Sequence, residues 1–222
     1  MRLLLTGFEP FAGFAANPTQ RLVEEIEAGA MIGLPATEVV TLLLPVTFDG
    51  ALARVRAALD DLRPDAVLSL GLAAGRTCVT PERVGVNIAH VEPASAGTGR
   101  DGREGGHDRA DNAGAAPRHA PVVAGGPDAL LATYAPERAV AALRAAGVPA
   151  AVSESAGTYV CNTVLYGVLE HLRRTGREEV PAGFVHVPAT LDLALADPTL
   201  PSMDVGLLQR AVAALLSDLR GS

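Results

Sequence analysis

Residues 38–70, EVVTLLLPVTFDGALARVRAALDDLRPDAVLSL, decide the fold class. After Glu38, the next six are apolar or β-branched and stop at Pro45, which is typical of a strand over 38–44. Residues 48–62 repeat apolar side chains at three- and four-residue steps, which predicts an amphipathic helix. The last five form another short apolar run. This strand–helix–strand order is typical of a mostly parallel sheet with helices on both faces.

The rest of the chain continues this alternation. We expect further strands at 3–5, 84–88, 150–153 and 183–187, and further helices from Pro18, over 136–143, from Val160 and over 204–219. No internal repeat or linker divides the chain. We therefore expect one domain over residues 1–222, an α/β/α three-layer sandwich around a mostly parallel twisted sheet. A Gly-, Ala- and charge-rich tract at about 91–121 interrupts it and predicts a flexible loop.

The composition excludes several classes of function. The net charge of −7 argues against a nucleic-acid partner, which requires a basic surface. All 18 positive residues are arginines, which excludes a lysine Schiff base and a Walker-type phosphate loop. No apolar run reaches the roughly 18 residues of a membrane span. The strand-like run beginning at Arg2 and the small number of cysteines predict a cytoplasmic protein with reduced thiols.

Residues 153–172, SESAGTYVCNTVLYGVLEHL, place a thiol at the start of a predicted helix. Small polar residues ending at Gly157 precede apolar residues at helical spacing, so Cys161 falls in the first helical turn. Free N–H groups and the helix dipole at such a position favour the thiolate, and this predicts a lowered pKa. The alternative is that Cys161 is a small buried hydrophobic residue.

A cysteine nucleophile needs a histidine base. His171 lies ten residues further along the same helix, roughly 15 Å away, and cannot reach the thiol. His107 and His119 belong to the polar tract, and His90 remains possible. His186 fits best, because FVHVP places it near the carboxyl end of an apolar strand.

A third group would orient the base, and Glu82 is the best candidate because it stands just before a predicted strand. The alternative for Glu82 is a surface charge paired with Arg83. The segment 8–14 holds three of the five phenylalanines in a loop after a strand. These rings either cover the core or form an apolar pocket wall at the carboxyl end of the sheet. His107, Asp108 and Asp111 do not form a convincing metal site.

Five motifs occur in one order along the chain. They are LLLTGFEPFAG with Asn17-Pro18-Thr19, LPVTF, GLAAGR with TPERVGVN, SAGTYVCN and GFVHVP. Together they closely resemble the pyroglutamyl peptidase I (pyrrolidone-carboxylate peptidase) family and cover nearly the whole chain. A glutamine-hydrolysing cysteine amidase fits less well, because the residues around Cys161 lack its glycine-flanked elbow.

The resemblance implies a cytosolic cysteine omega-peptidase, without metal or cofactor, that hydrolyses the amide bond after an N-terminal pyroglutamyl (5-oxoproline) residue. It implies Cys161 as nucleophile, His186 as base and Glu82 as orienting acid. The residues that it implies for binding the lactam are Phe8, Phe11, Asn17, Leu72 and Val160, and its oxyanion candidates are the Cys161 N–H and Arg76. Peptides carrying N-terminal pyroglutamate are the implied partners, and a dimer or tetramer is the implied assembly.

Three departures from the family pattern bear on activity. The tract 90–112 is longer and more glycine-rich, PATLDLALAD follows the histidine motif, and Ala12 replaces a glycine in the phenylalanine loop. None touches the implied triad. The alternative is therefore a homologue that binds pyroglutamyl ligands but turns them over weakly.

Overall fold

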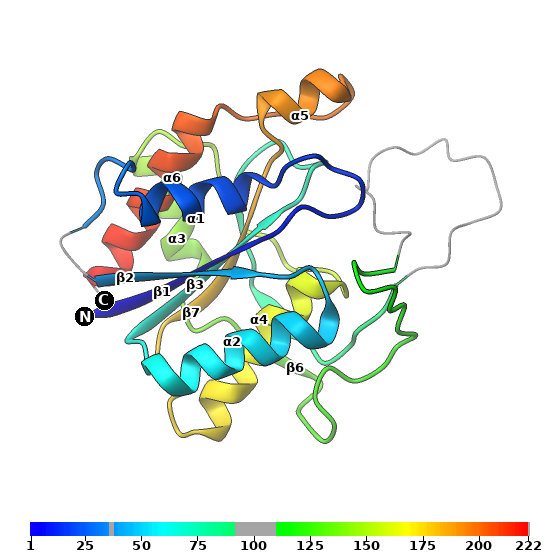
Figure 1. Ribbon diagram of the computed structural model, residues 1–222. Helices are drawn as coiled ribbons and strands as arrows, with labels where there is room; N and C mark the ends of the chain where they lie inside the picture. Colours follow the sequence, from blue (N-terminus) through cyan, green and yellow to red (C-terminus); the bar gives the residue numbers. More distant parts are fainter. Residues whose placement is uncertain (36–37, 92–109, 222) are drawn as a thin grey trace.

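The computed structural model describes residues 1–35, 38–91 and 110–221 (Figure 1). Its main sheet has the strand order β2-β1-β3-β7-β4, in which β4 alone is antiparallel to its neighbour. These strands are β1 (Arg2–Phe8), β2 (Glu38–Leu44), β3 (Ala66–Leu72), β4 (Thr80–Pro81) and β7 (Ala182–Val187). A small antiparallel pair, β5 (Val84–Val86) and β6 (Ala129–Leu131), lies beside it.

Helices cover both faces of the main sheet (Figure 1). One face carries α1 (Pro18–Glu27), α3 (Pro136–Ala145) and α6 (Val205–Arg220). The other carries α2 (Phe48–Leu62) and α4 (Val160–Arg174). A short helix, α5 (Leu191–Ala196), follows β7. The predicted three-layer α/β fold with a mostly parallel sheet is confirmed.

Strand β1 shows how the core is divided. Successive side chains of a strand point to opposite faces of the sheet. Leu3 and Leu5 accordingly pack with α1 and α6, while Leu4 packs with α2 and α4. All three are fully buried, so the short apolar run at the start of the chain supplies both halves of the core.

The predicted limits of β2 and α2 are confirmed, whereas β1 and β3 are longer than predicted. Strand β1 pairs with β2 as far as Phe8 opposite Leu44, and β3 pairs with β7 as far as Leu72 opposite Val187. The prediction of a strand over 150–153 was wrong. Ala150 and Ser153, at its two ends, each form an isolated β-bridge to one partner, and the four residues do not form a continuous strand.

Most of the predicted flexible loop lies outside the described residues, including His107 and Asp108. The part that follows, 110–121, contains a buried carboxylate, Asp111. Within the described ranges, no three His, Cys, Asp or Glu side chains are grouped to hold a metal ion. No described helix has the length and apolar character needed to cross a membrane.

Candidate active site

The candidate site lies where β1, β3 and β7 end. Parallel strands present their carboxyl ends at one edge of a sheet, where α/β proteins commonly bind ligands. Helix α4 begins above this edge, and Cys161 is its second residue. A Cβ placed on Gly71 of β3 would lie only 3.1 Å from Cys161 Sγ. Because Gly71 pairs with His186 in the sheet register, the thiol stands over the strands next to the predicted base.

His186 and Glu82 form a buried pair. His186 Nδ1 lies 2.7 Å from Glu82 Oε1, and the two residues are 5% and 1% exposed. Arg76 Nη1 donates to the same oxygen at 2.6 Å and also contacts the Thr80 hydroxyl. With the Nδ1 proton donated to Glu82, Nε2 of the neutral ring is left as the proton acceptor.

The alternative surface role for Glu82 is therefore wrong. Arg83, its expected partner in that alternative, binds Glu137 and Glu154 instead, both at 2.6 Å. The β4 pairing explains the burial, because the Glu82 N–H donates to the Phe184 carbonyl and brings the carboxylate next to β7. Sequence periodicity could not reveal this, since β4 has two residues.

The electrostatics of the site favour an ionised carboxylate beside a neutral imidazole. Burial raises the pKa of Glu82, but His186, the Ser153 hydroxyl and Arg76 outweigh it and bring the pKa below its ordinary value. Burial lowers the pKa of His186 despite the opposing effect of Glu82. Glu82 Oε2 is buried and accepts no hydrogen bond of ordinary geometry within the described chain, although the Ser153 hydroxyl is close enough to favour its charge.

The predicted lowering of the thiol pKa is wrong for this structure. Burial, followed by the Glu82 carboxylate, raises the pKa of Cys161 to about 12. Arg76 and the backbone N–H at the helix start act in the opposite direction but are weaker. The helix terminus is present as predicted. Desolvation of Sγ dominates because the surrounding side chains are largely apolar, although Cys161 as a whole is only half-buried.

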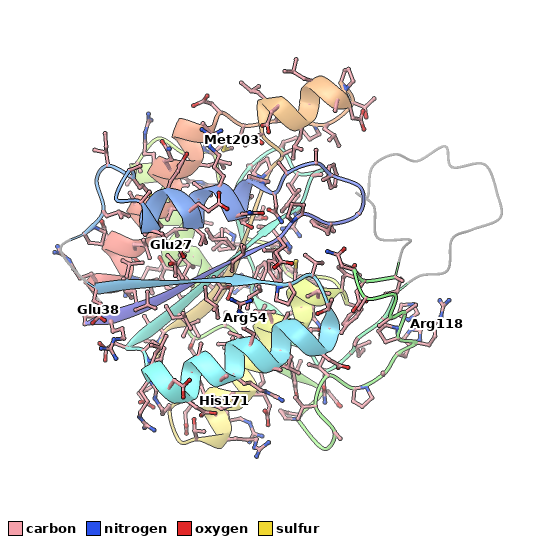
Figure 2. All side chains as sticks on the ribbon, in the orientation of Figure 1. Glu27, Glu38, Arg54, Arg118, His171 and Met203 are labelled. Atoms are coloured by element: carbon pink, nitrogen blue, oxygen red, sulfur yellow. The ribbon has the colours of Figure 1, made fainter. Side chains whose placement is uncertain are left out.

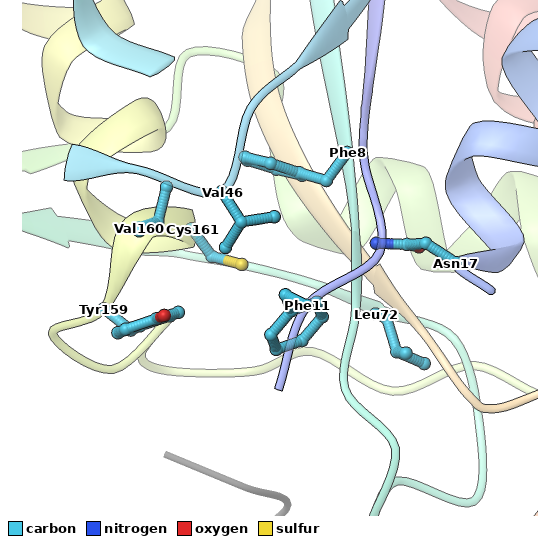
Figure 3. A pocket seen from close by; sticks show the side chains of 8 residues that line it. All are labelled: Phe8, Phe11, Asn17, Val46, Leu72, Tyr159, Val160 and Cys161. Atoms are coloured by element: carbon cyan, nitrogen blue, oxygen red, sulfur yellow. The ribbon is translucent and has the colours of Figure 1, made fainter. Parts of the chain in front are cut away.

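An apolar pocket opens directly in front of the thiol (Figure 3). Its empty volume is about 280 Å³, including solvent space at the mouth. It is lined by Phe8, Phe11, Asn17, Val46, Leu72, Tyr159, Val160 and Cys161. In Figure 3 the sulfur points into the space between the phenylalanine loop and Val46. The five residues that the resemblance implied for binding all line this pocket, and none of the eight lining side chains carries a formal charge.

Comparison with known proteins agrees with this geometry. The profile of the family described as pyroglutamyl peptidase matches residues 1–218. The chain belongs to this family. A pyrrolidone-carboxylate peptidase from Halalkalibacterium halodurans is 42% identical over 217 residues, covering 98% of each chain. One from Escherichia fergusonii is 39% identical over 210 residues, covering 95% of this chain and 88% of the relative.

Solved structures show the same fold. Pyroglutamyl peptidase I from Bacillus amyloliquefaciens superposes with a TM-score of 0.84 at 29% identity, covering 100% of this chain and 97% of the other. A mutant pyrrolidone carboxyl peptidase from P. furiosus gives 0.85 at 29% identity, covering 100% and 99%. The predicted family and enzyme class are thereby confirmed for this peptidase.

Two pocket residues of the peptidase were missed from sequence, Val46 and Tyr159. The Tyr159 ring packs against Phe11 and Phe48, with centroids 6.4 and 5.3 Å away. Two features of the sequence could have identified these residues. Tyr159 immediately precedes Val160, and Val46 follows a strand that ends at the same edge of the sheet as β1.

Asn17 lines the pocket but is already engaged with its own loop. Its Oδ1 accepts from the Thr19 N–H at 3.0 Å and from the Thr19 hydroxyl at 2.9 Å, and its Nδ2 donates to the Glu9 carbonyl at 3.0 Å. The Phe8 N–H in turn donates to Thr19 Oγ1. Asn17 therefore caps α1, as predicted, and also shapes the phenylalanine loop.

The other described histidines have different surroundings. His171 Nε2 lies 2.9 Å from Asp60 Oδ1, near the far end of α4 (Figure 2). His90 and His119 stack with ring centroids 3.8 Å apart, and the His119 N–H donates to His90 Nδ1. His186 is the histidine that shares a buried pair with a carboxylate next to the pocket.

Proposed function

We propose that this peptidase hydrolyses the amide bond after an N-terminal pyroglutamyl residue, with Cys161 as nucleophile, His186 as general base and Glu82 as orienting acid. The observation that carries the proposal is the placement of the thiol. Cys161 lines an apolar pocket, and its Sγ lies above Gly71, the strand neighbour of His186 in the buried His–Glu pair. This is the arrangement of nucleophile, base and orienting group that covalent acyl transfer requires.

The pocket lining supports the lactam as the group that is bound. A pyroglutamyl ring is flat, has two methylenes and one amide edge, and carries no free ammonium. Phe8 and Phe11 offer apolar surface for the methylenes, and backbone groups near Leu72 and Val160 are available to the amide edge. An aminopeptidase requires a negative group for the substrate ammonium, and the described residues that line this pocket include no such side chain.

Acylation begins from a neutral thiol and a neutral imidazole, as the pKa directions indicate. His186 Nε2 takes the thiol proton as Sγ attacks the pyroglutamyl carbonyl carbon, so thiolate and imidazolium arise together. Glu82 stabilises the imidazolium. The Cys161 N–H, which has no acceptor within the helix at the first turn of α4, donates to the developing oxyanion. The imidazolium then protonates the leaving amine as the C–N bond breaks.

Deacylation reverses these roles. His186 removes a proton from water, which attacks the thioester carbonyl, and the imidazolium returns that proton to Cys161 Sγ as pyroglutamate leaves. Arg76 remains a candidate for stabilising the oxyanion through its charge. Its Nη1 already binds Glu82, so we assign it also to holding the carboxylate in position for His186.

The test is release of a chromophore from a pyroglutamyl amide under reducing conditions. We expect Cys161→Ala to lose activity by about three orders of magnitude or more. Cys78→Ser, which changes the other free cysteine, is the matched control and should keep full activity.

Three results would contradict parts of the proposal. Absence of release by the parent protein would overturn the activity, and equal release by Cys161→Ala would overturn the nucleophile. Binding of a pyroglutamate analogue without turnover would support the weakly active homologue instead.

We also propose a cytoplasmic enzyme that uses no metal or cofactor and assembles as a dimer or tetramer. The support is the family resemblance of the motifs. Light scattering of the purified protein measures the assembly, and a monomer would contradict that part. Retention of activity in chelator would agree with the absence of a metal.

A further inference from the structure

The walls of the pocket come from three separate parts of the chain. Phe8 and Phe11 belong to the end of β1 and its loop, Val46 lies between β2 and α2, and Tyr159 immediately precedes α4. An apolar slot that recognises a flat ring depends on the spacing of its walls. Contacts that join these parts therefore determine how well the slot fits a lactam.

Asn112 joins two of the walls. Its backbone N–H donates to the Val46 carbonyl at 2.9 Å, and its side-chain Nδ2 donates to the Pro10 carbonyl at 3.0 Å. Pro10 lies between Phe8 and Phe11. Two residues before Asn112, the Ala110 carbonyl accepts a hydrogen bond from the Tyr159 hydroxyl at 3.5 Å. The segment 110–112 thus contacts all three parts.

Asp111 fixes this segment to the protein. It is 5% exposed, and its Oδ2 accepts from the Phe48 N–H at 2.9 Å, at the start of α2. Its Oδ1 accepts from the N–H groups of Ala113 and Ala115 at 2.9 and 2.8 Å. Helix α2 has no cap from its own Thr47, so the carboxylate supplies both the missing acceptor and the charge that suits a helix N-terminus.

We propose that Asn112 is a positioning residue that sets the separation between the phenylalanine loop and the Val46 wall, and thereby the affinity of the pocket for the pyroglutamyl ring. This deepens the function proposed above and rests on it. Asn112 itself is exposed and does not line the pocket, so it acts through Pro10 and Val46. Asp111 holds the segment in place, and the two hydrogen bonds of Asn112 then fix the distance between the Pro10 and Val46 carbonyls.

The variant Asn112→Ala removes the bond to Pro10 and keeps the backbone bond to Val46. Loss of one such bond predicts a KM about five- to tenfold higher for a pyroglutamyl amide, with kcat within about twofold. The inhibition constant of 2-pyrrolidone, which is the bare lactam ring, should rise by a similar factor. Alkylation of Cys161 by iodoacetamide should keep its rate, because the thiol and its base are untouched.

The matched control is Gln209→Ala, which removes another side-chain amide bond, from Gln209 Nε2 to Glu25 Oε2 at 2.6 Å. That bond joins α6 to α1, away from the pocket, so KM should not change. A second variant, Asn112→Asp, keeps the size of the side chain but has no N–H to donate at neutral pH. It should reproduce the higher KM.

An unchanged KM in either Asn112 variant, with an active parent, would overturn the positioning role. A loss of kcat at constant KM would do the same, since it would show that Asn112 affects the chemical step and not the binding of the ring. If the parent releases no chromophore, the failure belongs to the proposed function and not to Asn112.

Discussion

Two opposing effects act on the pKa of the Cys161 thiol. The start of α4 supplies N–H groups and dipole charge that favour a thiolate. The apolar pocket and the Glu82 carboxylate oppose it, and the net result is a thiol pKa of about 12. These pKa directions favour a neutral thiol at Cys161 and a neutral imidazole at His186 before substrate binds. In the mechanism that we propose, the charged pair forms only as the substrate carbonyl is attacked, when Glu82 would stabilise the imidazolium.

This predicts the pH dependence of alkylation in a Cys78→Ser background. Iodoacetamide reacts with thiolate, and a raised pKa means that the thiolate fraction is small and keeps growing with pH. The rate at Cys161 should increase about tenfold per pH unit through pH 9, past the ordinary cysteine pKa of about 8.5. A pyroglutamate analogue should protect the thiol. A rate that is already constant above pH 7 would show a stabilised thiolate and contradict the resting state described here.

At the scale of elements, three residues let helix α4 pack closely against its surroundings: Gly71, Gly85 and Asn162. Gly71 leaves room for the sulfur above β3. Gly85 of β5 lets the helix approach, since a Cβ there would lie 2.9 Å from the Tyr166 N. Asn162, fully buried, bonds Val86 N–H, Val86 carbonyl and Ile88 carbonyl at 2.9, 2.9 and 3.0 Å. Packing and hydrogen bonds thus fix the helix that carries the thiol.

Gly71→Ala should damage the site directly. The added Cβ would lie 2.7 Å from Phe184 Cζ and 3.1 Å from Cys161 Sγ, so the ring or the thiol must move. We expect activity to fall by at least about tenfold and stability to fall by about 1–3 kcal/mol, as overpacking does. Chromophore release and urea unfolding measure the two effects.

The control for this substitution is Gly183→Ala on the adjacent strand. Its Cβ would meet Tyr134 at 3.3 Å, away from the thiol. It should change stability more than activity. Full activity in Gly71→Ala would show that the thiol does not require its present position.

At the scale of the whole molecule, a buried tyrosine forms a hydrogen bond to α6 in the layer that α1, α3 and α6 form. Tyr134 is 3% exposed, and its hydroxyl donates to Asp218 Oδ2 at 3.0 Å. Asp218 belongs to α6 and also binds Arg138 of α3 at 2.8 Å. Burial, followed by the Asp218 charge, raises the pKa of Tyr134 well above its usual value. The hydrogen bond from Tyr134 to α6 therefore requires a protonated hydroxyl, whereas Arg138 joins α3 to α6 through its own ion pair with Asp218.

Tyr134→Phe should lower the free energy of unfolding by about 1 kcal/mol near neutral pH. Above a pH of about 10 the unfolded tyrosine ionises while the folded one stays protonated, so the parent loses stability as pH rises. Phenylalanine has no such group. The difference between the two proteins should therefore shrink above pH 10, as measured by urea unfolding from pH 8 to 11. A constant difference over that range would contradict the raised pKa.

Much of the molecule could be predicted from local patterns. The limits of β2 and α2 follow from residue periodicity and the prolines beside them, and the five motifs identify the family. These features are visible in sequence because period, turn residues and caps act over a few positions. The thiol at a helix start and the Asn17 cap could likewise be predicted from a few neighbouring residues.

Only the tertiary structure decided which distant groups meet. It paired Glu82 with His186, 104 positions away, gave Val46 and Tyr159 to the pocket, and placed Asn112 between its walls. It also decided the direction of the Cys161 pKa. The physical reason is that hydrogen bonds between remote segments and the desolvation of a group depend on what folding brings around it, and no local pattern contains that information.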